Sequence, residues 1–559
     1  MPNKKLVPQD ETEGKGQLGE QEKWRDNAPT VDEIRADIYE HVGRVIAFTE
    51  QSIEQGTNFY HFEKALIPLI FAIGRLFLCF FLCAKEHDST RPDKIRADDG
   101  RQFKLKDPAG RWLGTFFGKI RYWRAYMCQV GGAKGAGFHP LDTELGLTAD
   151  GFSIHVLSLV TWIATKLSYT QSVVALQHFL LWSPSKNALE EAILGFGRHT
   201  SAWFESCPAP EKDGEVLIIQ FDSKATPTAT EQELKKRRGK RRANPHPESA
   251  RHRGRVKRRK LGRKKRRKKG DKSKNGKMAT LVVMYTLKRS DDGKLLLGPM
   301  NKRIYASYAP KRHAFAIARR EADKRGFRED SGKLIQILTD GDEDLACYAK
   351  QFFPKAIHNI DIMHVNEHIW DAGRCIYKEG SELLEQWVEN QKKRLYNSNA
   401  KEIITELEGH MASIPRTGPG NKAKREKLTE VHNYLQKRIE MMDYKFLLAQ
   451  DLEIATGQVE GAVKYVIASR FDNGGMRWIK ERSEALLQLR CIEINGDWDR
   501  FIEFVNKRFG VSSAGLCTQK LLTDEPGPLP TLGIPPQSSS KKGQAKAKKP
   551  LQTLDKKAS

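Results

Sequence analysis

The stretch VLIIQFD, residues 216–222, is an apolar run with one glutamine that ends in an aspartate. A second stretch, LIQILTD at residues 334–340, has the same form. Short apolar runs rich in Ile, Val and Leu predict buried strands. An aspartate at a strand end is held on rigid backbone and leaves the core. We therefore expect Asp222 and Asp340 to project from strand ends.

Further strands and helices are predicted around these two runs. The predicted order is strand, strand, strand, helix, strand, helix, strand, over residues 216–222, 278–287, 302–308, 311–325, 333–339, 342–352 and 356–363. A turn sequence at Arg289–Gly293 favours an antiparallel meander of the first three strands. The final strand-helix-strand unit places Asp340 at the carboxyl end of a parallel strand, where open α/β sheets form their sites. The expected fold class is α+β or α/β and multidomain, with helices on both faces of a mixed sheet.

A third acidic residue, Glu460, lies in TGQVEGA at residues 456–462, which is typical of a helix start. Two strand-end aspartates and a helical glutamate can converge on divalent cations that prefer oxygen ligands. Asp222, Asp340 and Glu460 are therefore the predicted catalytic and metal-binding residues, with two Mg²⁺ or Mn²⁺ ions. One ion would activate water or a DNA 3′-hydroxyl, and the other would stabilise the leaving oxygen. The alternative is that strand-end aspartates only cap turns.

Asp361 and His364 form an Asp-Xaa-Xaa-His sequence at the end of the predicted strand 356–363. Because that strand would neighbour the strand of Asp340, we expect these two residues to be accessory to the site. They would steady it or contact a phosphate. A structural role for the histidine is the alternative.

The formal net charge of +26 favours a polyanionic partner, and one segment carries most of it. Residues 235–269 contain 21 lysines and arginines and a single acid, Glu248. Such composition predicts a disordered arm that neutralises DNA phosphates without reading sequence. A polycationic solubility arm is the alternative. The predicted DNA-binding residues are Lys235, Lys236, Arg237, Arg238, Arg241, Arg242, Arg258, Arg259, Lys264, Lys265, Arg266, Arg267 and, outside this arm, Arg477.

Composition and local sequence argue against other classes of protein. The eight cysteines show no spacing typical of a zinc or redox motif, which suits reduced thiols in a cytoplasm. Residues 1–26 have no apolar signal-peptide core. The apolar stretch 65–84 approaches the length of a membrane span, but Pro68 and Arg75 interrupt it. A core or partner-facing helix is favoured there over a membrane span.

The remaining chain divides by composition. A mainly helical N-terminal DNA-binding region is expected, with helices in 31–100 and an aromatic and basic β-hairpin in 101–140. Residues 141–210 read as helices, in which 169–181 and 186–198 flank a Ser-Pro turn. This pair is a candidate helix-turn-helix or an ordinary bundle pair. The predicted domains are 1–30 disordered, 31–100, 101–140, 141–210, 211–365 with a basic disordered insertion at 235–275, 366–452 helical, 453–515, and a disordered basic tail at 525–559.

The chain resembles DDE transposases of bacterial insertion sequences, in the branch related to eukaryotic Mutator elements. The matching residues are QFDSK (220–224), LTDGD (338–342), Asp361-Xaa-Xaa-His364, VEGAVK (459–464) and GMRW (475–478), with FEKAL (62–66), TFFGKI (115–120) and HPLD (139–142) upstream. Together they span roughly residues 60–505. The resemblance implies a ribonuclease H-like catalytic domain with a helical domain, residues 366–452, inserted before the glutamate.

The resemblance implies Mg²⁺-dependent DNA cleavage at element ends and strand transfer into target DNA, by a cytoplasmic, nucleoid-associated protein that forms a dimer or larger oligomer on DNA. Many relatives have a zinc-binding cysteine pair after the hairpin, whereas this chain has only Cys128 there, so no zinc is expected. Arg477 and the hairpin arginines Arg111–Arg124 are candidate phosphate contacts. Two alternatives remain: a ribonuclease H-like nuclease or resolvase without strand transfer, and a non-catalytic DNA-binding protein derived from a transposase.

Overall fold

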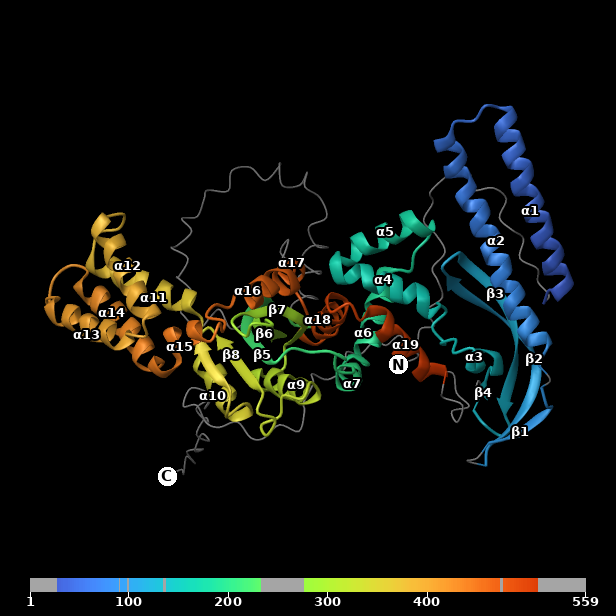
Figure 1. Ribbon diagram of the computed structural model, residues 1–559. Coiled ribbons are helices and arrows are strands. Elements are labelled where there is room, and N and C mark those ends of the chain that lie inside the picture. Colours follow the sequence, from blue (N-terminus) through green and yellow to red (C-terminus); the bar gives the residue numbers. More distant parts are fainter. Residues whose placement is uncertain are drawn as a thin grey trace, which may run out of the picture. The chain divides into compact units, whose positions relative to one another are not determined.

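The computed structural model describes residues 28–89, 91–97, 100–133, 137–232, 276–472 and 476–510. The chain separates into two structural units, one built mainly from residues up to 156 and the other mainly from residues 157–507 (Figure 1). Each unit is described by itself. The predicted disordered N-terminus, the basic insertion 235–275 and the tail 525–559 lie almost entirely outside the described residues, and so do all of the predicted DNA-binding residues except Arg477.

The larger unit is mixed α/β and is built on a five-stranded sheet of order β7-β6-β5-β8-β9. The strands are β5 (Val216–Pro227), β6 (Gly276–Arg289), β7 (Leu296–Ser307), β8 (Leu334–Thr339) and β9 (Ile357–Ile360). Strands β5, β6 and β7 form the predicted antiparallel meander. Strands β8 and β9 are parallel to β5, as predicted for the strand-helix-strand unit.

The strand predicted at 356–363 is shorter than expected. It ends at Ile360, and helix α11 (Ile362–Ile376) begins two residues later. The cause is Asp361, whose side chain accepts a hydrogen bond from the backbone N–H of Met363 (2.9 Å) and so caps the helix. Asp361 and His364 therefore lie on a helix start rather than on a strand.

The two faces of the sheet differ because side chains alternate along each strand. On β5, Leu217, Ile219 and Phe221 are buried in the core that packs against helices α9 (Lys311–Lys324) and α10 (Glu343–Phe352). Gln220 and Asp222 lie on the opposite face. That face is covered by the chain that contains the predicted glutamate helix.

The covering chain consists of four short segments, and it confirms the expectation of helices on both faces (Figure 1). They are α16 (Gly457–Ala462), the π-helix η4 (Val463–Ala468), α17 (Ser469–Phe471) and α18 (Lys480–Ile494). Helix α16 contacts β5 and β6, η4 contacts β5, and α18 contacts β7. Glu460 therefore lies in a helix start, as predicted, against β5. The strand predicted at 216–222 is longer than expected: pairing with β6 continues to Pro227, so Asp222 lies inside β5 and not at its end.

Further helices of this unit pack around α18 or form a separate lobe. Helices α4 (Ile154–Lys166), α5 (Tyr169–Leu180), α6 (Lys186–Gly197), α7 (Thr200–Ser206) and α19 (Trp498–Gly510) belong wholly or partly to it. Helix α6 packs against α18, and a Cβ atom at Gly197 would approach the Cβ of Ala485 to 2.5 Å. Because this helix packs so closely against α18, the structure favours an ordinary bundle pair over a DNA-reading helix-turn-helix for residues 186–198.

The predicted helical insertion is a lobe of helices (Figure 1). It contains α11, α12 (Glu382–Tyr396), α13 (Ala400–Ser413), α14 (Asn421–Gln436), the 3₁₀ turn η3 (Ile439–Met441) and α15 (Tyr444–Ala449). The sequence Gly418-Pro419-Gly420 separates α13 from α14, as its composition predicts.

A buried acid connects α18 to the sheet. The Glu484 carboxylate accepts hydrogen bonds from the Ser307 hydroxyl, the Tyr308 backbone N–H and the Gln488 amide, each at 2.6 Å. Complete burial raises the pKa of Glu484 to about 7. The folded protein therefore retains a proton here that the unfolded chain has lost.

This residue makes stability depend on pH. Below about pH 4.5, both states are protonated at Glu484; between about 4.5 and 7, only the folded state is; above 7, neither is. The contribution of Glu484 to the free energy of unfolding is thus fully present below pH 4.5. It is lost as the pH rises to 7, and the total loss is roughly 3 kcal/mol. Glu484→Gln should remove this loss. Urea unfolding of both proteins across this range tests it, and parallel pH curves for the two would contradict it.

The smaller unit joins a helical hairpin to a four-stranded sheet (Figure 1). The helices are α1 (Val31–Glu54) and α2 (Phe59–His87). The strands are β1 (Lys94–Arg96), β2 (Gln102–Thr115), β3 (Gly118–Gln129) and β4 (Gly137–Phe138), followed by the short helix α3 (Pro140–Glu144). Strands β2 and β3 are the predicted aromatic and basic hairpin, and β1 and β4 extend it on either side.

Two arginines of this hairpin are bound within the unit. Arg111 and Arg124 both donate to one carboxylate oxygen of Asp142, at 2.7 and 2.8 Å, and Tyr122 donates to the other at 2.5 Å. Asp142 is only 1% exposed. The basic residues at these two positions therefore stabilise the hairpin instead of projecting freely toward a phosphate.

Helix α2 is the one helix among the described residues that is long and apolar enough to cross a membrane. Length and composition alone are weak support for a span, because the core helix of a soluble protein meets the same test. One face of α2, with Leu76 and Cys79, is buried against α1 and β3. Arg75 on the same helix donates to the backbone carbonyl of Phe117 at 3.1 Å. The helix does not by itself indicate a membrane protein.

Candidate acidic metal site

Parallel pairing brings three aspartates to one edge of the larger sheet. In the register, Gln220 of β5 pairs with Leu338 of β8, and Thr339 of β8 pairs with Ile360 of β9. Asp340 and Asp361 directly follow Thr339 and Ile360, and Asp222 lies two residues after Gln220. Asp222 and Asp340 are partly exposed, and Asp361 is buried.

The surroundings of Asp222 disfavour the ionised form of its carboxyl group. Burial raises the pKa of its carboxyl group, and the negative charges of Asp340 and Glu460 raise it further. A 2.5 Å hydrogen bond from the Ser223 backbone N–H and the charge of His364 offset part of this effect. Because the charges of Asp340 and Glu460 contribute to this rise after burial, both carboxylates lie near enough to Asp222 to repel its negative charge.

The loop that carries Asp340 is held by the helical lobe. Tyr434 of α14 donates to the Asp340 backbone carbonyl (3.2 Å), and Arg438 donates to the Gly341 carbonyl (2.6 Å). Gly341 has φ +85°, and a Cβ atom there would lie 2.5 Å from the Tyr434 hydroxyl. Only glycine fits this position. The following acid, Asp342, caps α10, because its side chain accepts hydrogen bonds from the Asp344 and Leu345 backbone N–H groups.

Asp361 and His364 form a hydrogen-bonded pair. The carboxylate of Asp361 lies 2.8 Å from His364 Nδ1 and accepts a 2.6 Å bond from the Thr456 hydroxyl. Burial alone would raise the pKa of Asp361, but these bonds outweigh it and lower the pKa. The bond to Asp361 raises the pKa of His364 to about 9, with a contribution from the charge of Asp340. The histidine is therefore a cation among carboxylates at neutral pH.

Side-chain amides position Glu460 beside the aspartates. Gln220 Oε1 accepts from the Val459 backbone N–H (3.0 Å), one residue before Glu460. Gln336 exchanges two bonds with the Glu453 backbone, and Asn359 donates to the same carbonyl. These three residues are 0%, 0% and 2% exposed. They attach the chain 453–459 to the sheet, one amide on each of β5, β8 and β9.

Sequence reasoning did not find these amides. The only signal is that VLIIQF and LIQILT each place one glutamine inside a buried strand. A buried amide needs partners, and here its partners are backbone groups more than 100 residues away. Thr456, which bonds to Asp361, carries no local signal of its own.

The residues at metal-ligand spacing differ in part from the predicted set. Within the described ranges, the potential ligand atoms of Asp361, His364 and Glu460 all lie within 4.8 Å of one another. Asp222 and Asp340 are coupled to this group by charge. Glu460 thus belongs to both sets, and the predicted accessory pair lies inside the site.

The donor set fits a hard divalent cation. Four carboxylates lie near one cationic side chain, His364: those of Asp222, Asp340, Asp361 and Glu460. Carboxylate oxygens are the ligands that Mg²⁺ and Mn²⁺ prefer. A bound cation would relieve the repulsion that raises the pKa of Asp222.

Replacing Gln220 with leucine should detach the helix start that carries Glu460. The change leaves the Val459 N–H and the Tyr285 hydroxyl, which Gln220 contacts at 3.1 Å, without their buried partner. The cost is about 1–3 kcal/mol. Hydrogen exchange over residues 453–462 should accelerate about 5- to 100-fold, whereas Ile218→Leu on the same strand should leave it unchanged. Equal exchange in both variants would contradict this assignment.

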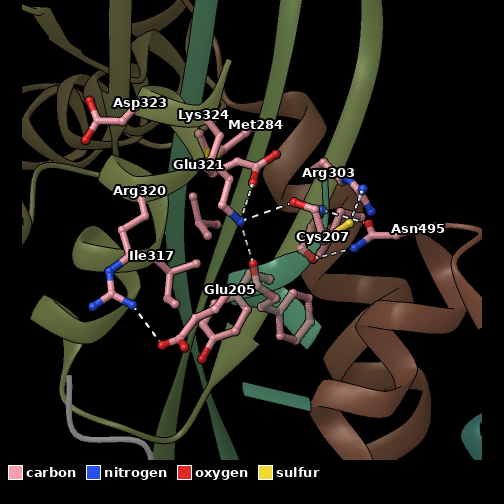
Figure 2. Close-up of a pocket in the computed structure, with 14 residues that line it drawn as sticks. Glu205, Cys207, Met284, Arg303, Ile317, Arg320, Glu321, Asp323, Lys324 and Asn495 are labelled. Atoms are coloured by element: carbon pink, nitrogen blue, oxygen red, sulfur yellow. Dashed lines mark hydrogen bonds and ion pairs between the residues drawn. The ribbon is translucent and has the colours of Figure 1, made fainter. Parts of the chain in front are cut away.

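A separate cavity of about 380 Å³ lies on the opposite face of the sheet, against β6, β7, α7 and α9 (Figure 2). Its charged side chains bind one another: Arg320 with Glu205 at 2.9 Å, and Arg303 with Asp497. Val282 and Met284 form part of its apolar floor. With its charges already paired, this cavity does not resemble a metal centre.

The comparisons with known proteins give no independent support for any family. No protein-family model matches the chain, and no curated protein is significantly similar to it. Conclusions about function therefore rest on the residues and geometry described above.

Proposed function

We propose that this protein is a DDE-type transposase that cleaves DNA at the ends of an insertion sequence and transfers the strands to target DNA. The observation that carries the proposal is the convergence of Asp222, Asp340 and Glu460 at the carboxyl edge of the mixed sheet. These residues are separated by more than 100 positions in the sequence, yet the charges of the other two act on Asp222. Such an acidic cluster suits phosphoryl transfer.

The architecture supports the ribonuclease H-like assignment that the sequence resemblance implies. An antiparallel meander, β7-β6-β5, continues into the parallel strands β8 and β9. The first acid follows the buried part of β5, the second follows β8, and the third lies on a helix after the helical lobe. The order of elements and acids is that expected of the family.

Each residue of the cluster has a distinct task in this proposal. Asp222, Asp340 and Glu460 would hold Mg²⁺ or Mn²⁺, in two sites. The bound cations would neutralise charge on the phosphoryl group and lower the pKa of the attacking water or 3′-hydroxyl. Asp361 orients the His364 ring through Nδ1. This leaves the Nε2 of the imidazolium to donate to a phosphate oxygen.

DNA is the proposed partner, in keeping with the net charge of +26. The basic segment 235–269 follows the strand of Asp222 in sequence and would neutralise phosphates near the site. We further propose a cytoplasmic, nucleoid-associated protein that assembles as a dimer or larger oligomer on DNA. A nuclease of the same fold without strand transfer is the second candidate, because the acidic cluster serves hydrolysis equally well.

Cleavage of DNA that flanks the protein's own gene tests the proposal. Purified protein is incubated with a plasmid carrying both flanks, a target plasmid, and Mg²⁺, Mn²⁺ or EDTA. The expected products are 3′-hydroxyl ends at fixed positions and their covalent joining to the target, only with a divalent cation. Cleavage without joining would favour the nuclease. No cleavage with either metal would overturn both.

A further inference from the structure

A second cavity, of about 510 Å³, lies beside the far end of β5. Its lining includes Tyr169, Arg470, Arg477, Trp478 and Arg482. The chain at Trp478 pairs with this strand end: Ala229 N–H donates to the Trp478 carbonyl (2.9 Å), and Trp478 N–H donates to the Pro227 carbonyl (3.1 Å). The cavity is therefore attached to the strand that carries Asp222.

Arg470 in this cavity has an unsatisfied donor. The residue is 2% exposed, its Nε donates to the Ala164 carbonyl (2.9 Å), and Nη1 contacts Met476 Sδ (3.8 Å). Nη2 is buried and has no hydrogen-bond partner in the described part of the chain. An unpartnered charged donor is costly inside a protein. An acceptor that enters the cavity would remove this cost.

A neighbouring arginine shows that the fold can satisfy such a group fully. Arg490 is also buried, and its Nε, Nη1 and Nη2 donate to the backbone carbonyls of residues 466, 165 and 465. Arg490 is therefore structural. Arg470 differs from Arg490 because its Nη2 donor has no described partner and the residue lines the second cavity.

The charge balance of the cavity favours an anion. Its two acids, Glu190 and Glu231, are both paired with Arg482, at 2.8 and 2.9 Å. Arg470 and the exposed Arg477 form no ion pair with a described residue. The Arg470 guanidinium lies 5.0 Å from the Trp478 ring, which fixes its position. Burial lowers the pKa of Arg470 only to about 10, so it remains a cation at neutral pH.

We propose that this cavity binds one backbone phosphate of the DNA strand that extends from the acidic cluster, with Arg470 and Arg477 as donors. The inference rests on the proposed function, because the cluster defines the strand. Thr228, which bridges to Trp478, follows Asp222 by six residue steps of extended chain. They span about 20 Å. At about 3.4 Å per phosphate along one strand, the contact lies about six nucleotides from the reacting phosphate.

Binding measured without catalysis tests the proposal. A labelled duplex of the DNA flanking the gene is titrated with full-length protein in EDTA at several salt concentrations. Arg477→Gln and Arg470→Gln should each reduce the slope of log K against log salt by about 1, the loss of one phosphate contact. Arg328→Gln, an exposed arginine at the opposite end of β8, is the control and should keep the slope.

A neutral methylphosphonate placed at successive positions locates the contact. Wild type should lose affinity at one position, and Arg477→Gln should be insensitive there. Because Arg477 is exposed, this variant keeps the test valid if Arg470→Gln fails to fold. Unchanged slopes, or the absence of any single sensitive position, would overturn the inference. If the arginine variants keep the wild-type salt slope while the wild-type protein cleaves the gene-flank DNA, only this phosphate site is rejected. If the variants lower the slope but the wild-type protein does not cleave, only the transposase proposal is rejected.

Discussion

Replacing Asp222 with asparagine should reduce metal-dependent DNA cleavage on the order of 10³-fold or more while leaving the protein folded. Asparagine keeps the shape of the side chain but removes the charge that the proposed cations require. The cation-free protein should also become more stable. Burial and the charges of Asp340 and Glu460 raise the pKa of Asp222, so its ionised form opposes folding at neutral pH.

Two measurements separate this effect from general damage. The gene-flank cleavage assay reports activity, and thermal unfolding with and without Mn²⁺ reports binding. Mn²⁺ should raise the unfolding temperature of wild type and have much less effect on Asp222→Asn. Asp330→Asn, at the exposed opposite end of β8, should behave as wild type in both. Cleavage by Asp222→Asn at the wild-type rate would contradict the assignment of Asp222.

Replacing Asp142 with asparagine should unfold the smaller unit at a much lower temperature. The carboxylate is buried and neutralises Arg111 and Arg124. Burial and the neighbouring Asp142 charge also raise the pKa of Tyr122, which keeps its hydroxyl as a donor. Removing the charge leaves two partly buried cations with no counter-charge. We expect a loss of about 3–5 kcal/mol, on the order of 10 °C in unfolding temperature.

Limited proteolysis and thermal unfolding of the full chain provide the measurement. Cleavage sites that appear first in Asp142→Asn should fall within residues 91–153. Asp107→Asn, an exposed aspartate on the same hairpin, is the matched control. If Asp142→Asn resists protease and heat as well as this control, the buried ion pairs contribute little to the hairpin.

The strands and the positions of the acids could be predicted because local sequence determines them. VLIIQF and LIQILT are buried runs, and parallel pairing of the neighbouring strands β5 and β8 brings Asp222 and Asp340 close together, although β5 continues beyond Asp222 to Pro227. The predicted strand at 356–363 was too long because Ile362 and Met363 resemble strand residues. Its true end depends on a capping bond from Asp361, which the apolar pattern does not reveal.

Features that depend on distant partners were not predictable. Arg111 and Arg124 suggested a basic surface, but their partner Asp142 lies in a different element. The amide of Gln220 interrupts a buried apolar run, and it positions the helix of Glu460 from more than 200 residues away. In each case, the role of the side chain depends on a polar contact with a residue far away in the sequence. A single sequence does not reveal such a contact.

The bonds from Tyr434 and Arg438 to the loop of Asp340 have a consequence for attempts to shorten this protein. The helical lobe is all-helical and lies between β9 and the chain that covers the mixed sheet, which makes it an obvious segment to remove. Excising it would remove the two hydrogen bonds that Tyr434 and Arg438 donate to the backbone of this loop. A shortened protein built from residues 211–365 and 453–510 would therefore need a substitute brace at Gly341 to hold Asp340 in position.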